Sequence, residues 1–185
     1  MAALATQAAQ ARPGSDPRQR ELQTLYEAHV RDVWCALRRL GVPERDLDDA
    51  AHEVFLVAYR RLDDYDRSRP ARPWLTGIAW RVAAAWRRRA GARLVQIGLP
   101  TDAATPDMDA EHEMRRQQDI RTVHDALAQL PEAQRDVFVL HEIEGLSMPD
   151  IADAVDAPLN TLYSRLRLAR ARFIAEVRHL VGETP

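Results

Sequence analysis

The chain has 185 residues, a length that suits one large domain or two small ones. Hydrophobic residues make up 46% of the chain, enough for real cores, and a formal net charge of −2 excludes a simple polycation. All 26 basic residues are arginines, whose planar guanidinium groups suit phosphates and base edges. The lone Cys35 excludes an internal disulfide and a cysteine-based zinc site, so the expected location is the reducing cytoplasm. No apolar run of about 18 residues occurs, and we expect no insertion into a membrane.

Helical periodicity dominates the sequence and predicts an all-α fold with two small domains. Residues 1–21 are alanine-rich and are expected to form a disordered tail, followed by four helices within residues 22–92. A polar, acidic stretch with two prolines marks residues 93–115 as a flexible linker, and a second helical domain is expected over residues 116–181. Glycine and proline mark the expected helix breaks, at Gly41-Val42-Pro43, Asp63–Pro73, Leu130-Pro131, Gly145-Leu146-Ser147 and Asp156-Ala157-Pro158.

The predicted helix Pro43–Leu62 has one surface that does not fit a simple solvated face. Its core side is expected to hold Leu47, Ala51, Val54, Phe55, Ala58 and Leu62. The opposite side combines acids with a large apolar residue and comprises Asp49, His52, Glu53, Leu56 and Arg60. The helix dipole explains part of the acidity, and single exposed leucines are common. Because DNA would repel these carboxylates, we interpret this face as a docking site for a basic protein partner.

An acid-free stretch from Arg67 to Thr101 contains a first arginine-rich helix, around residues 74–89. Its core side is predicted to hold Leu75, Ile78, Ala79, Val82, Ala85 and Trp86. Trp80 is predicted on the opposite side, near Ala84 and Arg87, where a ring among guanidinium groups suits stacking on exposed bases. Packing of Trp80 against a neighbouring helix is the alternative. The candidate DNA-binding residues are Arg67, Arg69, Arg72, Trp80, Arg81, Arg87 and Arg88.

A second arginine-rich helix lies around residues 160–178, after a short helix that Ser147 can cap. A tight turn over residues 156–158 separates the two, and Asn160 can cap the longer one. This order is typical of a helix-turn-helix, which places the start of its second helix in the major groove. The longer helix is expected to bury Leu162, Leu166, Ala169, Phe173, Val177 and Leu180. The candidate DNA contacts are Asn160, Thr161, Tyr163, Ser164, Arg165, Arg167 and Arg172. A helical hairpin with an arginine-rich solvent face is the alternative.

Catalytic and metal motifs are missing from the sequence. The pairs His52-Glu53 and His141-Glu142 are followed, four residues after each histidine, by Leu56 and Gly145, where a zinc-hydrolase helix needs a second histidine. The 6 histidines have no ligand spacing, and the 7 glycines form no phosphate-binding loop. We therefore expect no enzyme activity, no metal and no cofactor.

Two segments carry a family resemblance. The segment DLDDAAHEVFLVAYRRLDDYD, followed by RPWLTGIAWRVAAAWRRR, resembles region 2 of bacterial sigma factors of the extracytoplasmic-function group (sigma-70 group 4). The segment LPEAQRDVFVLHEIEGLSMPDIADAVDAPLNTLYSRLRLARARF resembles their region 4. Together the two regions span nearly everything from residue 22 to 181, and the ordered pair is more specific than either part. The resemblance implies a transcription initiation factor that directs core RNA polymerase to promoters.

The resemblance also implies a role for each surface. The clamp helices of the polymerase β′ subunit would bind the face made by Asp49, His52, Glu53, Leu56 and Arg60. The loop Asp63–Arg72 and the helix Pro73–Arg89 would open the −10 element and hold an unpaired base of the non-template strand. The second arginine helix would read the −35 element as duplex, and the first helices of its domain would touch the β flap. The linker would pass through the polymerase interior or serve as a solvated tether. An anti-sigma partner and a role in the stress response are further implications.

Several positions depart from the family pattern. His52 stands where a glutamine is frequent, and Tyr163 where a frequent lysine would contact a phosphate. Trp80-Arg81 replaces the usual Arg-Asn pair, which changes the base contacts expected there. Asn160 replaces a common glycine, and Asp156 stands at a turn where glycine is usual. Asparagine caps helices well, and aspartate tolerates the turn geometry better than most residues.

A free-standing helix-turn-helix regulator is the alternative from another class. Its N-terminal domain would bind an effector or dimerise, and the acid-free window that begins at Arg67 argues against such a domain. The slight net acidity also argues against tight unaided binding, because phosphate neutralisation dominates affinity for DNA. A protein that a polymerase carries to DNA depends less on neutralising phosphates with its own charge.

Overall fold

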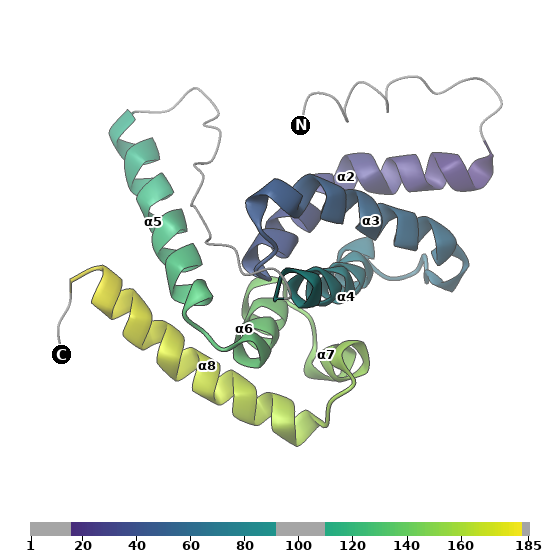
Figure 1. Cartoon of the computed structure of the whole chain (residues 1–185). Coiled ribbons are helices and arrows are strands. Elements are labelled where there is room, and N and C mark those ends of the chain that lie inside the picture. Colours follow the sequence, from purple (N-terminus) through teal and green to yellow (C-terminus); the bar gives the residue numbers. More distant parts are fainter. Residues whose placement is uncertain (1–15, 92–109, 183–185) are drawn as a thin grey trace. The chain divides into compact units, whose positions relative to one another are not determined.

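The computed structural model describes residues 16–91 and 110–182. The chain divides into two compact units between Leu94 and Val95. Helices and their connecting turns make up both described ranges, without a strand, which confirms the predicted all-α class (Figure 1). None of the helices in these ranges has the length and hydrophobicity that a membrane crossing requires. Residues 1–15 of the predicted tail and residues 92–109 of the predicted linker lie outside the described residues.

The first unit contains three α-helices and two 3₁₀ turns within residues 16–91. They are α2 (Pro17–Arg39), η1 (Glu44–Asp46), α3 (Leu47–Arg60), η2 (Leu62–Asp64) and α4 (Ala71–Gly91). Helix α2 begins at Pro17 and not near residue 22, because Asp16 accepts a hydrogen bond from the backbone nitrogen of Arg18 at 3.1 Å. Proline suits the first helical position, where its missing N–H has no partner to lose. The predicted break after α2 is present, with Gly41 at a φ of 84°.

The core of the first unit fixes α4 against both α2 and α3. Alanines at the helix contacts allow close approach, and four of them have no exposed surface: Ala50, Ala58, Ala79 and Ala83. Larger side chains fill the remaining space, and the fully buried ones include Leu37, Leu40, Leu47, Val54 and Leu62. Each such side chain contributes roughly 1.5–3 kcal/mol by leaving water. Because α4 is covered on two sides, only a narrow strip of it faces solvent.

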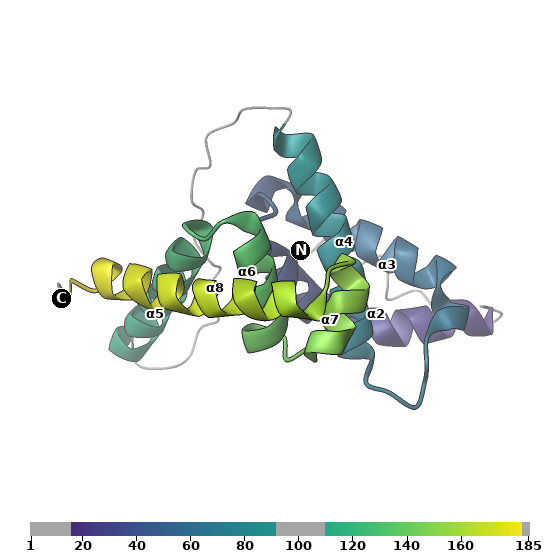
Figure 2. The same ribbon diagram turned by 90° about the horizontal axis from the view of Figure 1, so that it is seen from below.

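The second unit contains four α-helices and one π-helical turn within residues 110–182. They are α5 (Ala110–Ala128), α6 (Glu132–Phe138), η3 (Val139–Ile143), α7 (Met148–Val155) and α8 (Leu159–Leu180). The second helical stretch was predicted from residue 116, whereas α5 begins at Ala110. The three predicted helix breaks of this unit all occur. Helix α8 packs against α5, α6 and α7, and Figure 2 shows it crossing α6, with α7 beside its start.

The buried stripe of α8 is shorter than predicted. Leu162, Leu166 and Ala169 are buried, and the ring of Phe173 packs on that of Phe138 with centroids 4.7 Å apart. The prediction that Leu180 is buried is wrong, because 44% of its surface is exposed. Helix α8 has 22 residues against 7 in α6 and 8 in α7, so its end extends beyond the helices that cover its start.

Candidate nucleic-acid interface

The predicted docking face on α3 is largely assembled. Asp49, His52, Leu56 and Arg60 are exposed, and Leu56 has 42% of its surface in solvent. Their spacing of three or four residues places them on one side of the helix. Glu53 is only half-buried at the edge of this face and turns toward α4.

Glu53 connects α3 to the last turns of α4. Its Oε2 accepts a hydrogen bond from the indole nitrogen of Trp86 at 2.9 Å and lies 3.6 Å from a guanidinium nitrogen of Arg89. The Arg89 guanidinium also lies over the Trp86 ring, 5.7 Å from its centroid. The prediction placed Trp86 on the core side, whereas the side chain is half-buried at the helix interface. The indole N–H is the signal that favours such a position, because it needs an acceptor when buried.

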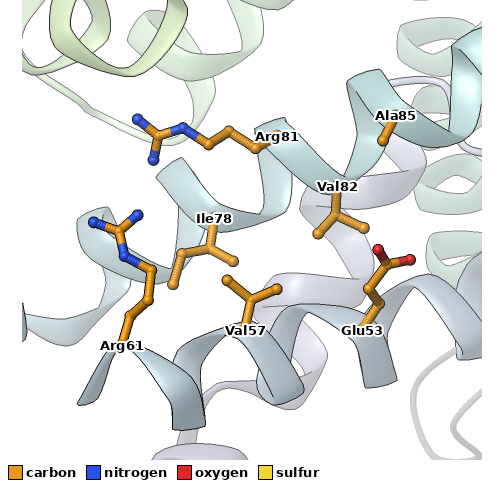
Figure 3. Close-up of a pocket in the computed structure, with 7 residues that line it drawn as sticks. All are labelled: Glu53, Val57, Arg61, Ile78, Arg81, Val82 and Ala85. Atoms are coloured by element: carbon orange, nitrogen blue, oxygen red, sulfur yellow. The ribbon is translucent and has the colours of Figure 1, made fainter. Parts of the chain in front are cut away.

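A groove of about 190 Å³ lies between α3 and α4. Its floor is apolar, and its lining residues are Glu53, Val57, Arg61, Ile78, Arg81, Val82 and Ala85. Figure 3 shows the guanidinium groups of Arg61 and Arg81 at one end and the carboxylate of Glu53 at the other. Small-molecule sites usually measure about 300–1,000 Å³. The groove is below this range and is better matched to a single side chain.

The exposed strip of α4 holds fewer of the predicted DNA-binding residues than expected. Arg72, Arg81 and Arg88 are exposed, and Trp80 is half-buried. The prediction of an outer side shared by Trp80, Ala84 and Arg87 is wrong for two of the three. Ala84 is buried, and Arg87 is half-buried and donates a hydrogen bond to the backbone oxygen of Leu40. That bond satisfies a carbonyl at the C-terminus of α2 and places a cation where the helix dipole favours one.

The loop before α4 is fastened to the start of α2. Arg67 forms a two-pronged ion pair with Glu21, from its Nε at 2.7 Å and from a terminal nitrogen at 2.8 Å. The Glu21 carboxylate thereby raises the pKa of Arg67. Arg18 donates to Asp63 at 2.9 Å and to the backbone oxygen of Tyr59 at 3.3 Å. Arg18 and Glu21 were not among the predicted site residues, because they fall in the predicted tail and lie more than forty residues from their partners.

Contacts within the loop also hold its shape. The Tyr65 ring stacks on Trp74 with centroids 4.8 Å apart, and its hydroxyl donates to the backbone oxygen of Arg69 at 3.0 Å. Asp66 accepts hydrogen bonds from the hydroxyl of Ser68 at 2.7 Å and from its backbone nitrogen at 2.9 Å. These bonds stabilise the carboxylate and lower the pKa of Asp66. The exposed Arg69 is therefore carried by an ordered turn.

The predicted helix-turn-helix is present in the second unit. The hydroxyl of Ser147 accepts from the backbone nitrogen of Asp150 at 3.3 Å, which confirms the predicted cap of α7. Asp156 adopts the left-handed conformation at φ 51° and ψ 57°, as expected at a turn where glycine is usual. The predicted cap by Asn160 is wrong. Pro158, with φ −60° and ψ 139°, already occupies the position before the helix, so α8 starts at Leu159 and Asn160 lies inside its first turn.

The candidate contacts of α8 fall into two groups. The first covers about three turns from its start, where Arg165 is half-buried and the exposed members are Asn160, Thr161, Tyr163, Ser164 and Arg167. Arg172 is set apart, roughly 20 Å along the axis from Leu159, and donates to the side-chain oxygen of Gln134 at 3.0 Å. Arg170 is similarly engaged by Glu142 at 2.9 Å. The start of α8 is therefore the part best arranged to enter a groove.

No group of three or more potential metal ligands occurs among the described residues. His141 has a structural contact, since its Nδ1 lies 3.0 Å from the backbone oxygen of Leu146, in the turn before α7.

The comparisons with known proteins agree with this arrangement. Residues 25–93 match the family described as Sigma-70 region 2, and residues 120–173 match Sigma-70, region 4. The RNA polymerase sigma factor CnrH of Cupriavidus metallidurans is 30% identical over 176 residues, which cover 91% of each protein. The ECF RNA polymerase sigma-E factor of Haemophilus influenzae is 31% identical over 149 residues, covering 76% of this chain and 79% of that protein. The chain belongs to the sigma-70 family, in its extracytoplasmic-function group.

Solved structures share the fold of this sigma factor. The structure of CnrH in complex with the cytosolic domain of CnrY has a TM-score of 0.57 at 28% identity and covers 94% of both chains. The sigma factor RpoE in complex with the anti-sigma factor NepR from Bartonella quintana has a TM-score of 0.67. It covers 89% of this chain and 99% of that one, and at 16% identity it shows a likeness of fold alone. The region 2 match on the first unit of this sigma factor does not favour a free-standing regulator.

Proposed function

We propose that this sigma factor binds core RNA polymerase, directs it to specific promoters and opens their −10 element. The observation that carries the proposal is the ordered pair of matches, region 2 on the first unit and region 4 on the second. The two units also differ in a way that suits two forms of DNA. The first has a loop and a helix with arginines around Trp80, and the second has a helix-turn-helix with an exposed polar start.

The exposed face of α3 is the proposed contact for the clamp helices of the β′ subunit. Leu56 offers apolar surface, Asp49 offers negative charge, and His52 and Arg60 flank them. Glu53 belongs to this surface in a different way, because its carboxylate already binds Trp86 and so orients α4. The first helices of the second unit, α5 and α6, are the proposed contact for the β flap.

The loop before α4 and the exposed strip of α4 are proposed to hold the melted −10 element. Arg69, Arg72, Arg81 and Arg88 are exposed and can neutralise the phosphates of a single strand. Trp80 is half-buried, and its ring is proposed to stack on an unpaired base. Flipping that base out of the duplex costs a few kcal/mol, which stacking and pocket contacts offset. Two other candidates already have partners within the unit. Arg87 donates to the backbone oxygen of Leu40 at the end of α2, and Arg67 is paired with Glu21.

The start of α8 is proposed to read the −35 element as duplex. Arg165 is proposed to bond a guanine with both prongs of its guanidinium, the commonest specific contact in a major groove. Thr161 and Ser164 are exposed beside it and suit bases or phosphates. Asn160, Tyr163 and Arg167 complete this surface, whereas the contact between Arg172 and Gln134 makes Arg172 a peripheral phosphate contact at most.

An anti-sigma protein is the proposed regulatory partner. The support is that similar proteins were solved in such assemblies, CnrH with the cytosolic domain of CnrY and RpoE with the anti-sigma factor NepR.

Replacing Leu56 by arginine is expected to weaken association with sigma-free core polymerase by about tenfold or more. The change removes an exposed apolar side chain and adds a cation to a face proposed to meet a basic partner. The measurement is a titration of the fluorescently labelled chain with core polymerase in the absence of DNA. Leu168→Arg is the matched control, because Leu168 is 40% exposed on α8 against 42% for Leu56 on α3. Equal losses in the two variants, or none in Leu56→Arg, would remove α3 as the docking face.

A further inference from the structure

The ion pair between Glu21 and Arg67 joins the start of α2 to the loop proposed to hold single-stranded DNA. Both prongs of the guanidinium meet the two carboxylate oxygens, at 2.7 and 2.8 Å. The pair is accessible, with 58% of the Arg67 side chain and 29% of the Glu21 side chain exposed. Planar two-pronged pairing is the geometry with which arginine binds a carboxylate or a phosphate. The Glu21 carboxylate therefore offers Arg67 what a backbone phosphate would offer, two acceptor oxygens and one negative charge.

The pair with Glu21 is one of several contacts that hold the loop in position. Its first residues are held by Arg18, which donates to Asp63 and to the backbone oxygen of Tyr59 and lies over the Tyr59 ring, 5.6 Å from its centroid. Farther along the loop, Tyr65 stacks on Trp74. These other contacts can keep the loop in place while Arg67 exchanges Glu21 for another anion. Exposed ion pairs contribute little net stability, so a competing anion can displace one at small cost.

We infer that Glu21 occupies, in the free chain, the place of a DNA backbone phosphate on Arg67 and competes with single-stranded DNA for it. The inference rests on the proposed function, in which this loop meets the melted strand. In the free chain the Arg67 cation is masked by Glu21, and a phosphate of the single strand takes over both prongs when DNA binds. Glu21 thus lowers the affinity of the free chain for any single strand whose phosphate must displace it from Arg67.

The test is binding of the full chain to a fluorescein-labelled single-stranded 12-mer of mixed sequence, measured by anisotropy over a range of low salt concentrations. Glu21→Gln removes the charge and keeps the shape. It is expected to tighten binding about two- to fivefold. It is also expected to steepen the slope of log affinity against log salt by up to about 0.7, the value for one phosphate contact on a single strand, because a displaced glutamine, unlike Glu21, takes up no counterion. Glu27→Gln is the matched control, because Glu27 is an exposed acid of the same helix that bonds Gln23 instead of an arginine. It makes the same change in net charge and is expected to have a smaller effect.

The double variant Glu21→Gln with Arg67→Gln tests whether the gain in affinity depends on Arg67. We expect the double variant to bind no more tightly than Arg67→Gln alone. Equal effects of Glu21→Gln and Glu27→Gln, weaker binding by Glu21→Gln, a gain that survives the loss of Arg67, or no binding by any variant would each overturn the inference. The assay contains no polymerase. If the chain initiates transcription but fails this binding test, only the inference about Glu21 is excluded. If the chain does not initiate transcription, that result counts against the proposed function.

Discussion

Replacing Trp80 by alanine is expected to slow promoter opening by about 5- to 150-fold while changing closed-complex affinity much less. Trp80 is half-buried in α4 and directly precedes the exposed Arg81. Stacking of one base on an aromatic ring contributes about 1–3 kcal/mol, and 1.4 kcal/mol corresponds to tenfold. That contact exists only after the base leaves the duplex, so its loss falls on the opening step. The measurement is the fluorescence of 2-aminopurine in the −10 element, compared with closed-complex affinity at low temperature.

Two variants separate stacking from packing. Trp80→Phe keeps an aromatic face and is expected to retain most of the opening rate. Trp34→Ala is the matched control, because Trp34 belongs to the same unit but is carried by α2 and bonds Asp48 at 3.1 Å. It is expected to cost stability without a selective effect on opening. Equal losses of closed-complex affinity and opening in Trp80→Ala, or no loss of either, would assign Trp80 to the packing of α4.

Replacing Arg165 by alanine is expected to weaken recognition of the −35 element by about 5- to 150-fold and to relax base preference at one position. A two-pronged bond to guanine contributes about 1–3 kcal/mol of discrimination against the wrong base. Arg165 lies in the second turn of α8, the part that a helix-turn-helix places in the major groove. The measurement is holoenzyme affinity for promoter fragments in which each −35 base pair is replaced in turn.

The control for this experiment is Arg178→Ala, an exposed arginine in the last turn of α8 and roughly 20 Å farther along the helix. Its loss is expected to change the salt dependence of binding at most, and to affect all sequences equally. If Arg165→Ala leaves every base preference intact and lowers affinity uniformly, Arg165 is a phosphate contact and another residue reads the −35 element.

Helix caps, turns and helix breaks could be predicted from short stretches of sequence. Ser147 caps α7 as predicted, and Asp156 adopts the left-handed turn that its position requires. The breaks at Gly41 and Gly145 are present, with φ of 84° and 73°. Each of these features is decided by a few neighbouring residues, so a sequence motif is enough to predict it.

The predictions were wrong or incomplete where contacts between distant residues, or a competing residue nearby, determine the position of a side chain. The outer side predicted for α4 assumed one buried stripe, but α4 is covered by two helices, so Ala84 is buried and Arg87 caps α2. The pair of Glu21 with Arg67 joins residues 46 positions apart, and that of Glu53 with Trp86 joins residues 33 apart. No periodicity encodes such contacts. The Asn160 cap failed for a different reason, since Pro158 two residues earlier already fixes an extended conformation before the helix.

Transcription with sigma-free core polymerase tests the central claim most directly. The chain is added to core polymerase and fragmented DNA from its own source, and the 5′ ends of the transcripts are mapped. We expect transcripts that require the chain and that share two upstream elements at constant spacing, one for α8 and one for the loop and α4. The contrary result is a chain that binds palindromic duplexes alone as a dimer, while core polymerase neither binds it nor gains initiation at any site.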